Sequence, residues 1–485
     1  MRPLPHRAGM LLASLLLAGC VSTHGLAPES SPRDADALAT TQTFSASTDA
    51  GFPRQDWWTA YGDPQLAALI DEALAGTPSL AAADARVRQA IAQAGLADAA
   101  RKPTLGGTAQ YAGVLIPETV APGDLGGDYQ GVVLLGLNFK WSLDLWGGHA
   151  AQWRAALDQA RAAEVEAQAA RLMLASNIAR TYIALAQAHE AADTAAAEAK
   201  RASALERLSR QRVDAGIDNQ LQLRTAEATI ASAQQQAQAA RQQVDAARNA
   251  LAALLGKGPD RGLAIGKPAL LQAPSPAVPA VLPSELLGHR PDVVAARWRV
   301  EAASERIASA KTDFYPSVNL SALVGVASGH LSDLFSSDAL LANGGPALSL
   351  PIFDGGRLRN QLAKTDADYD LAVADYDQSL VGAVHEVADA VQSARSLDAQ
   401  IASATQARDA AQRAYDIATS RYEAGLGTQL DVLSAQRPLL QFDQQVVALR
   451  AQRFAASVDL QRALGGGLSI AHPVALTPSP ASASE

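Results

Sequence analysis

Residues 135–145 read LGLNFKWSLDL and alternate without a lapse between apolar and small or polar side chains. A period of two puts the apolar side chains on one face of a β-strand and the others on the opposite face. Gly147-Gly148 end the strand, and residues 149–215 then contain neither proline nor glycine. Such a stretch predicts one helix of roughly 100 Å. A short strand joined to a very long helix is therefore the unit from which the fold is built.

This unit occurs twice, because the chain between Pro78 and Gly465 is an internal tandem duplication. Pro78, Arg86, Val87 and Pro103 recur 213 residues later as Pro291, Arg299, Val300 and Pro316. Arg212, Gly216, Gln220 and Leu221 recur 209 residues later as Arg421, Gly425, Gln429 and Leu430. A repeat of ~210 residues is far longer than the 20–50 residues of a solenoid, so each half should supply the same part of a symmetric object.

Each half is predicted to contain a helix, two strands, a very long helix and a final helix. The first half gives helix 64–101, strands 104–116 and 129–145, and helices 149–215 and 219–255. The second half gives helix 284–313, strands 317–327 and 346–353, and helices 357–424 and 428–464. Residues 223–254 keep an unbroken heptad register, and the matching register of the second half has one polar lapse, at Arg453. The predicted fold is mainly α, with a small β part and long antiparallel coiled coils.

The domain order follows from this division. Residues 1–19 are a signal peptide, 20–55 an N-terminal tether, 56–256 the first structural repeat, 257–283 a Pro/Gly-rich connector, 284–465 the second structural repeat, and 466–485 a Pro/Ser/Ala tail predicted to be disordered.

Four strands cannot close a barrel, and an open sheet edge in lipid leaves backbone groups without hydrogen bonds. Closure therefore requires several chains, so we predict a symmetric oligomer; a dimer and a trimer both satisfy this condition. Strands that are apolar outside and polar inside are typical of a transmembrane barrel with an aqueous lumen. A soluble sheet with one buried face alternates in the same way.

The N-terminus predicts secretion and lipid anchoring. Arg2 and Arg7 precede the apolar stretch 10–18, which is too short to span a bilayer. Leu17-Ala18-Gly19-Cys20 has the form of a bacterial lipobox, in which Cys20 carries the lipid, and Val21 favours the outer membrane. An ordinary signal peptide with a chance cysteine is the alternative. Several acyl chains on one cysteine give a firm anchor.

Composition argues against other classes. The net charge is −9, and removing residues 1–19 takes away two arginines and no acids, which gives −11. Nucleic-acid binding needs a basic face instead. Cys20 is the only cysteine, the histidines are scattered, and His385-Glu386 has Asp389 where a zinc helix needs a second histidine. We expect no enzyme, no metal and no cofactor besides the covalent lipid.

Several motifs together resemble one family. They are LPSELLGHRPDV at 282–293, ASAK at 308–311, Tyr315-Pro316, Trp57-Trp58, GDPQL at 62–66 and LPIFDGGR at 350–357. Across nearly the whole mature chain the sequence resembles the TolC-like outer-membrane efflux factors, in the NodT-type lipoprotein branch.

The resemblance implies a homotrimer, with a twelve-stranded β-barrel in the outer membrane and a twelve-helix α-barrel across the periplasm. It implies a passive channel that works with a periplasmic adaptor protein and an inner-membrane pump of the RND type. It places Gly216 and Gly425 at the periplasmic tips, Leu430 in an apolar ring at the constriction, and Arg437 in the polar network of the gate. Ser434 stands where many relatives have an aspartate, so Asp431 is the candidate for the gate's acidity.

Other functions compete with small-molecule efflux. A type I secretion channel for peptides or proteins has the same architecture. A non-catalytic structural lipoprotein shares the heptads but has no reason to carry strands of alternating polarity. A periplasmic enzyme has no residues to support it. Drugs, metal ions, solvents and peptides are all open as cargo.

Overall fold

A computed structural model describes residues 22–34, 38, 54–115, 117, 119, 129–274, 276 and 290–467. Cys20, more than half of the predicted tether, the end of the predicted connector from residue 277, and nearly all of the predicted tail lie outside them. The chain divides into two compact units. Unit 1 comprises residues 1–32, 86–163 and 296–377; unit 2 comprises 33–85, 164–295 and 378–485. Each unit therefore takes matching pieces from both predicted repeats.

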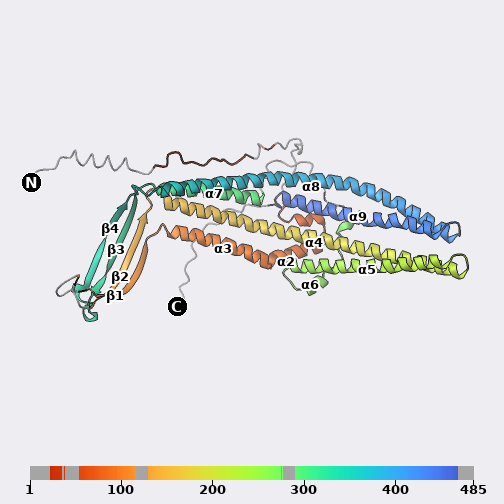
Figure 1. The fold of residues 1–485 in the computed structure, drawn as a ribbon, viewed down its shortest axis with the longest axis horizontal. Helices are drawn as coiled ribbons and strands as arrows, with labels where there is room; N and C mark the ends of the chain where they lie inside the picture. Colours follow the sequence, from red (N-terminus) through yellow and green to blue (C-terminus); the bar gives the residue numbers. More distant parts are fainter. Residues whose placement is uncertain are drawn as a thin grey trace, which may run out of the picture. The chain divides into compact units, whose positions relative to one another are not determined.

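The elements follow the predicted order (Figure 1). They are η2 (Trp57–Tyr61), α2 (Pro64–Gly76), α3 (Pro78–Ala99), β1 (Thr104–Leu115), β2 (Tyr129–Leu143), α4 (Gly148–Asp214), α5 (Gln220–Leu254), α6 (Asp260–Leu263), η3 (Leu270–Gln272), α7 (Pro291–Thr312), β3 (Ser317–Ser328), η5 (Leu331–Asp333), η6 (Ser337–Ala339), β4 (Leu340–Ser349), α8 (Arg357–Glu423) and α9 (Gln429–Ala463). The two long helices, α4 and α8, begin and end within one residue of the predicted bounds.

Three predicted elements differ from the structure. The predicted helix 284–313 includes Arg290, which is not helical, and α7 begins at Pro291, because proline is favoured in the first turn of a helix. The single helix 64–101 is wrong: α2 and α3 are separated at Thr77, which is extended (φ −91°, ψ 150°). The cause is Pro78, because proline disfavours the helical conformation in the residue before it. The strand 346–353 is also wrong, since β4 covers Leu340–Ser349. Its central Asn343-Gly344-Gly345-Pro346 has low strand propensity, and pairing with β3 overrides that propensity.

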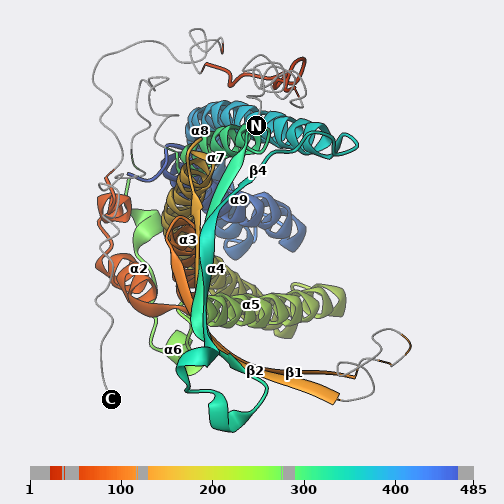
Figure 2. The ribbon, with the colours of Figure 1, turned by 90° about the vertical axis from the view of Figure 1, so that its left-hand side faces the viewer.

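The β part lies in unit 1 and is one four-stranded antiparallel sheet in the order β1-β2-β3-β4 (Figure 1). Figure 2 shows the same sheet turned by 90°, with β1, β2 and β4 labelled. The hairpin predicted for each half is present, and β2–β3 pairing joins the two hairpins. Gly136 and Gly325 face each other in this pairing. Their backbones approach so closely that a Cβ on Gly325 would lie 2.2 Å from the Leu135 carbonyl oxygen.

The register gives the sheet two unlike faces. Directly paired residues share a face in an antiparallel sheet. One face, which we call the apolar face, carries the rows Gly107–Leu137–Val324–Ala342 and Ala109–Leu135–Val326–Leu340. The opposite face, which we call the polar face, carries the rows Gly106–Asn138–Leu323–Asn343 and Thr104–Lys140–Ser321–Gly345. The alternation predicted for residues 135–145 is thus confirmed in β2, and the polar face of the other strands also carries Leu323 and Leu341.

The main core belongs to unit 2 and packs η2 and α2 against α4, α5 and α9. Asp63 caps α2 by accepting from the backbone N–H groups of Gln65 and Leu66, and its carboxylate also accepts from the Tyr182 hydroxyl at 2.9 Å. Arg453, the polar lapse in the heptad register, is 3% exposed and paired with Asp398 at 2.8 Å. An ion pair therefore replaces an apolar heptad contact at this position.

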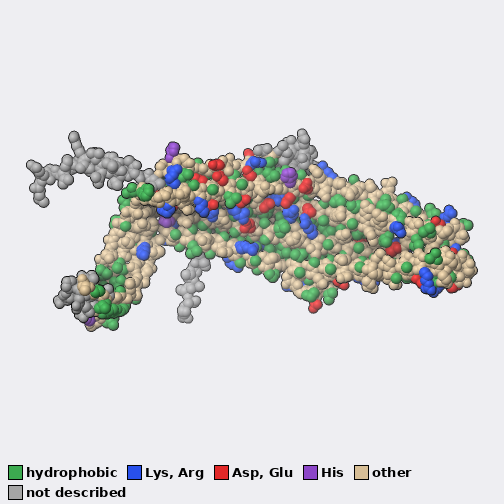
Figure 3. Space-filling model, viewed as in Figure 1, with side chains coloured by type: hydrophobic (Ala, Val, Ile, Leu, Met, Phe, Trp, Pro, Cys, Tyr) green, Lys and Arg blue, Asp and Glu red, His purple; other side chains and the backbone are tan. Residues whose placement is uncertain are grey.

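Among the described residues no single helix has the length and apolarity to cross a bilayer; only the pair α2 and α3, bent by 42°, passes such a test jointly. On the face drawn in Figure 3, acidic and basic side chains gather over the helices, and the strands carry few.

The close approach of β2 and β3 gives a first prediction. Gly325→Ala places a methyl group against the Leu135 carbonyl, and we expect it to destabilise the sheet by about 1–3 kcal/mol. The measurement is the temperature at which the folded band of a detergent gel is replaced by the unfolded band. Gly345→Ala, in β4, meets nothing within 4 Å and is the matched control. Equal melting of the two variants would contradict the close approach.

Candidate functional site at the helix turns

Two helix turns of unit 2, between α4 and α5 and between α8 and α9, form the candidate site. Gly216 and Gly425 lie in the left-handed region, with φ of 73° and 78°. After each glycine the chain closes on the preceding helix in the same way: Ile217 N–H donates to the Arg212 carbonyl, and Leu426 N–H to the Arg421 carbonyl, both at 2.8 Å. This is the six-to-one hydrogen bond of a Schellman turn, for which glycine is favoured. The internal duplication is thus visible in individual hydrogen bonds.

Each turn leads into a helix with a capping box. The Asn219 side chain accepts from Leu221 N–H at 2.8 Å, and Asn219 N–H donates to Gln222 at 3.1 Å. In the second turn the Asp431 carboxylate accepts from Thr428 N–H and from the Thr428 hydroxyl, both at 2.8 Å. These reciprocal bonds satisfy backbone groups that a helix start otherwise leaves open. Asp431, the predicted source of gate acidity, is therefore engaged in capping.

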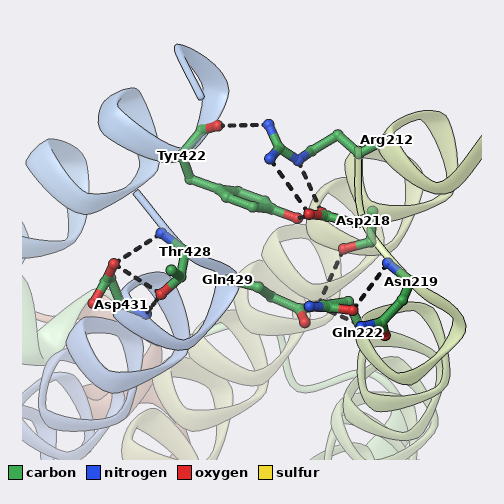
Figure 4. Close-up of polar contacts among 9 residues, drawn as sticks. Arg212, Asp218, Asn219, Gln222, Tyr422, Thr428, Gln429 and Asp431 are labelled. Atoms are coloured by element: carbon green, nitrogen blue, oxygen red, sulfur yellow. Dashed lines mark hydrogen bonds and ion pairs between the residues drawn. The ribbon is translucent and has the colours of Figure 1, made fainter. Parts of the chain in front are cut away.

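A charged contact joins the two turns (Figure 4). Arg212 pairs with Asp218 at 2.8 Å, and the Tyr422 hydroxyl donates to the same carboxylate at 2.8 Å. Arg212 also donates to the Tyr422 carbonyl at 3.1 Å, and its guanidinium lies 4.5 Å from the centre of the Tyr422 ring. Tyr422 is 1% exposed. One side chain from α8 is thus held by an ion pair of the first turn; we call Arg212, Asp218 and Tyr422 the turn link.

A second contact supports the turn link from the start of α9. Gln429 donates to the Ser209 hydroxyl and to the Gln222 carbonyl, both at 3.1 Å. Ser209 is fully buried and Gln429 nearly so. Gln429 is the repeat counterpart of Gln220, but only the second copy crosses to the other helix pair.

The electrostatics follow from this geometry. The hydrogen bond from Arg212, assisted by that from Tyr422, lowers the pKa of Asp218 below its ordinary value. Reciprocally, the bond to Asp218 raises the pKa of Arg212. The carboxylate is ionised at neutral pH, so both hydrogen bonds to it are charge-assisted.

The other predicted gate residues lie along the first turns of α9. Leu430 is 71% exposed, and Ser434 and Arg437 are exposed as well. Among the described residues Arg437 has no hydrogen-bond or ion-pair partner. Pro438 follows inside the helix, and because it has no N–H the Ser434 carbonyl lacks its usual donor. The helical ladder is thus weakest where the gate candidates lie.

Sequence reasoning missed Asp218 and Tyr422. Both lie where the two repeats differ: at the offset of 209, Asp218 matches Gly427, and Tyr422 matches Val213. A contact between the two turns needs a different partner on each side. The sequence signal that could have found these residues is therefore a position near a turn at which the two repeats differ.

Unit 1 carries a different surface where the strands meet the helices. Trp141 donates to the Arg101 carbonyl at 3.2 Å, and Trp146 donates to the Pro316 carbonyl at 2.7 Å. The Trp146 and Tyr315 rings stack with centres 5.0 Å apart. Phe353, between β4 and α8, is 89% exposed. Aromatic side chains with one polar tip are typical of a membrane–water interface.

The N-terminal segment of unit 1 is held on α8 near this junction. Arg359 donates to the Ser22 carbonyl at 2.7 Å. The Asp370 carboxylate accepts from the N–H groups of Glu29 and Ser30, at 3.1 and 2.8 Å. Between these contacts Leu26 packs against an apolar cluster that contains Phe314 and Leu362. The chain just after Cys20 is therefore fixed at both ends of residues 22–30.

These features define a class. A sheet with one apolar face, an aromatic junction and long paired helices that end in polar-linked turns is the protomer of a membrane channel. Among the described residues no group of His, Cys, Asp and Glu has the arrangement of a metal site.

Comparison with known proteins agrees. The family described as outer membrane efflux protein matches over residues 69–257 and 282–466, one stretch in each predicted repeat. The chain belongs to this family, and its location is the outer membrane. It is 40% identical to the fusaric acid resistance protein FusA of Burkholderia cepacia over 74% of this chain and 68% of that protein. It is 33% identical to the pyoverdine export outer membrane protein OpmQ of Pseudomonas aeruginosa, over 94% and 96% of the two chains.

Solved structures share the fold. The outer membrane protein VceC of Vibrio cholerae is 38% identical, with a TM-score of 0.79 over 86% of this chain and all of that one. CusC is 29% identical, with a TM-score of 0.79 over 91% of this chain and all of that one. The resemblance drawn from the motifs is thereby confirmed.

The turn link gives a second prediction. Tyr422→Phe removes one hydrogen bond to an ionised acceptor, worth about 1.5–3 kcal/mol. In single-channel recordings we expect the ratio of open to closed time to rise by roughly one to two orders of magnitude. Asp218→Asn should act similarly, and the double variant should add little, because both changes remove the same contact. Tyr376→Phe, earlier on α8, is the control, and additive effects of the two changes would contradict the link.

The same link sets a pH response. Because the folded-state pKa of Asp218 is lowered, its stabilisation is complete above the ordinary carboxyl pKa of about 3.9 and is lost as the pH falls through the lowered value. Acidification below about pH 4 should therefore loosen the wild-type turns more than those of Asp218→Asn, in which the Asp431 cap, whose pKa is also lowered by its bonds with Thr428, still titrates.

Proposed function

We propose that the protein is the passive outer-membrane channel of a tripartite efflux system. Three copies form a barrel from their sheets and an α-barrel from their long helices. A periplasmic adaptor protein and an inner-membrane pump of the RND type complete the assembly. The pump supplies the energy, and the channel carries out no catalytic step. Relatives named for multidrug resistance, fusaric acid resistance and pyoverdine export favour small molecules over secreted proteins as cargo.

The observation that carries this proposal is the polarity of the sheet. One face is apolar along all four strands, and the other bears Thr108, Asn138, Lys140 and Ser321. Both outer strands, β1 and β4, pair on one side only. A bilayer has no water to satisfy the free edges, so further copies must pair with them. The lumen of the resulting barrel is lined by the polar face.

In this channel the helix turns form the gate. Leu430 is proposed to point toward the axis in each copy, where a ring of leucines excludes water. Arg437, exposed and without a partner among the described residues, is proposed to bind a carboxylate or carbonyl of a neighbouring copy. Gly216 and Gly425 form the periplasmic tips, and Ser434 and Asp431 are polar residues beside the constriction.

The channel and its gate are tested together in planar bilayers. Purified wild-type protein should conduct weakly, and Leu430→Ala should raise the single-channel conductance, because three bulky side chains leave the axis. Leu221→Ala is the matched control: it is the repeat counterpart, is 73% exposed, and lies in the same first turn of its helix. Arg437→Ala should also raise the conductance, and this increase should be smaller in high salt than in low salt. Intact trimers with unchanged conductance in Leu430→Ala would place the constriction elsewhere, and trimers without any conductance would refute the channel.

We also propose that Cys20 is the lipidated first residue of the mature chain. The support is the position of the segment after it. Two residues span at most ~7 Å, so Cys20 lies within that reach of Ser22, which Arg359 holds near the aromatic junction. The acyl chains then begin at the level of the membrane surface.

Substitution of the cysteine tests the anchor. In Cys20→Ser, labelling with a radioactive fatty acid should be abolished and the signal peptide retained, because the lipid-dependent cleavage has lost its substrate residue. Arg359→Ala leaves the lipobox intact and should be labelled normally, while residues 22–24 become accessible to protease. Labelling that persists in Cys20→Ser would contradict lipidation at this position.

A further inference from the structure

Lys140 is the only charged side chain in the four strands. Residues 104–115, 129–143, 317–328 and 340–349 contain no aspartate, glutamate or arginine and no second lysine. The helices, in contrast, carry charges of both signs along their length (Figure 3). A single charge in a surface otherwise free of charge dominates the electrostatic potential around it.

The register fixes the face on which Lys140 lies. Its row across the sheet is Thr104–Lys140–Ser321–Gly345, on the polar face, while its neighbours Phe139 and Trp141 lie on the apolar face. Ser321 and Gly345 are small, and Lys140 is exposed. The ammonium group therefore has free space above the polar face.

Among the described residues no carboxylate forms an ion pair with this ammonium group. Within the part of the chain that the structure describes, the Lys140 side chain has no ion-pair partner, and the Thr104 hydroxyl donates to the Lys140 carbonyl at 3.3 Å. The nearest acid along the strand's continuation, Asp144, accepts from the N–H groups of His149 and Ala150 at the start of α4. Its charge is thus directed at a helix N-terminus.

We propose that Lys140 forms a ring of positive charge in the lumen, one ammonium from each copy, and that this ring makes the barrel selective for anionic solutes. The inference rests on the proposed channel, because the polar face must line the lumen. In the opposite orientation Lys140 would face hydrocarbon, where a charged side chain is strongly disfavoured. Rings of lysine or arginine are a known means of anion selectivity in pores.

The ring lies at the helix end of the barrel. Thr104 is the first residue of β1, and the adjacent Trp141 donates to the Arg101 carbonyl at the strand–helix junction. Every solute that leaves the α-barrel must pass this level before it enters the barrel. Carboxylates and phosphates are the class that three unpaired ammonium groups would attract.

Ion selectivity tests the proposal directly. Full-length protein is reconstituted in planar bilayers, and the reversal potential is measured in a tenfold KCl gradient, both in the wild type and with Leu430→Ala, which removes the constriction. Lys140→Gln should shift the reversal potential toward that of a cation-preferring pore, and Lys140→Glu should shift it further. The shifts should shrink in 1 M salt, where the Debye length is about 3 Å against about 10 Å at 0.1 M.

Lys102→Gln is the matched control, since it also removes one lysine charge per copy. Lys102 lies just before β1 and pairs with Asp98 at 2.5 Å, outside the strands. Tripolyphosphate, added on the side of the β1–β2 loop, should block the wild-type pore in a voltage-dependent way and block Lys140→Gln at least tenfold less tightly.

Two outcomes separate the inference from the proposed function. Normal conductance with the same reversal potential in wild type, Lys140→Glu and Lys102→Gln overturns the cation ring and leaves the channel standing. A wild-type protein that never conducts, even with Leu430→Ala, refutes the channel itself.

Discussion

The two free edges of the sheet constrain everything else in this molecule. The backbone N–H and C=O groups on the outer sides of β1 and β4 have no partner strand among the described elements. In hydrocarbon each such group costs several kcal/mol, and no side chain of a neighbouring strand can satisfy a whole edge. Association of copies is thus a requirement of backbone chemistry, and it does not depend on an apolar patch.

The two repeats agree at some positions of the turns and differ at others, and the two kinds of position have different roles. Where the structure must be symmetric, as in the Schellman turns after Arg212 and Arg421, the repeats form the same six-to-one hydrogen bond, at 2.8 Å in both. Where the turns must recognise each other, they differ. Asp218 and Tyr422 have no counterparts of the same chemistry, and Gln429 makes a crossing contact that Gln220 does not. A pseudo-symmetric scaffold can therefore carry a directed contact at little cost to its packing.

Regular elements were predictable and contacts were not. The bounds of α4 and α8 follow from the lack of proline and glycine, and the two faces of the sheet follow from its period of two. The break at Thr77 was visible in Pro78 but is a local effect that the helical periodicity conceals. The strand β4 depends on pairing with β3, because its own residues favour a turn. The Tyr422–Asp218 bond joins residues 204 positions apart, and no local pattern encodes such a contact.

The chemistry of the turn link allows the two turns to separate at a lower cost than an apolar contact between them would. An apolar contact released into water loses its full transfer free energy, and the exposed surface would favour closing again. A hydrogen bond to a carboxylate is exchanged for bonds to water, so release costs only the net difference, about 1.5–3 kcal/mol. Coupling free energies between binding sites have the same size, about 1–3 kcal/mol. In the proposed assembly, binding of a partner protein at the turns would be enough to shift the link from mostly closed to mostly open, while the cores of the helix pairs stay packed.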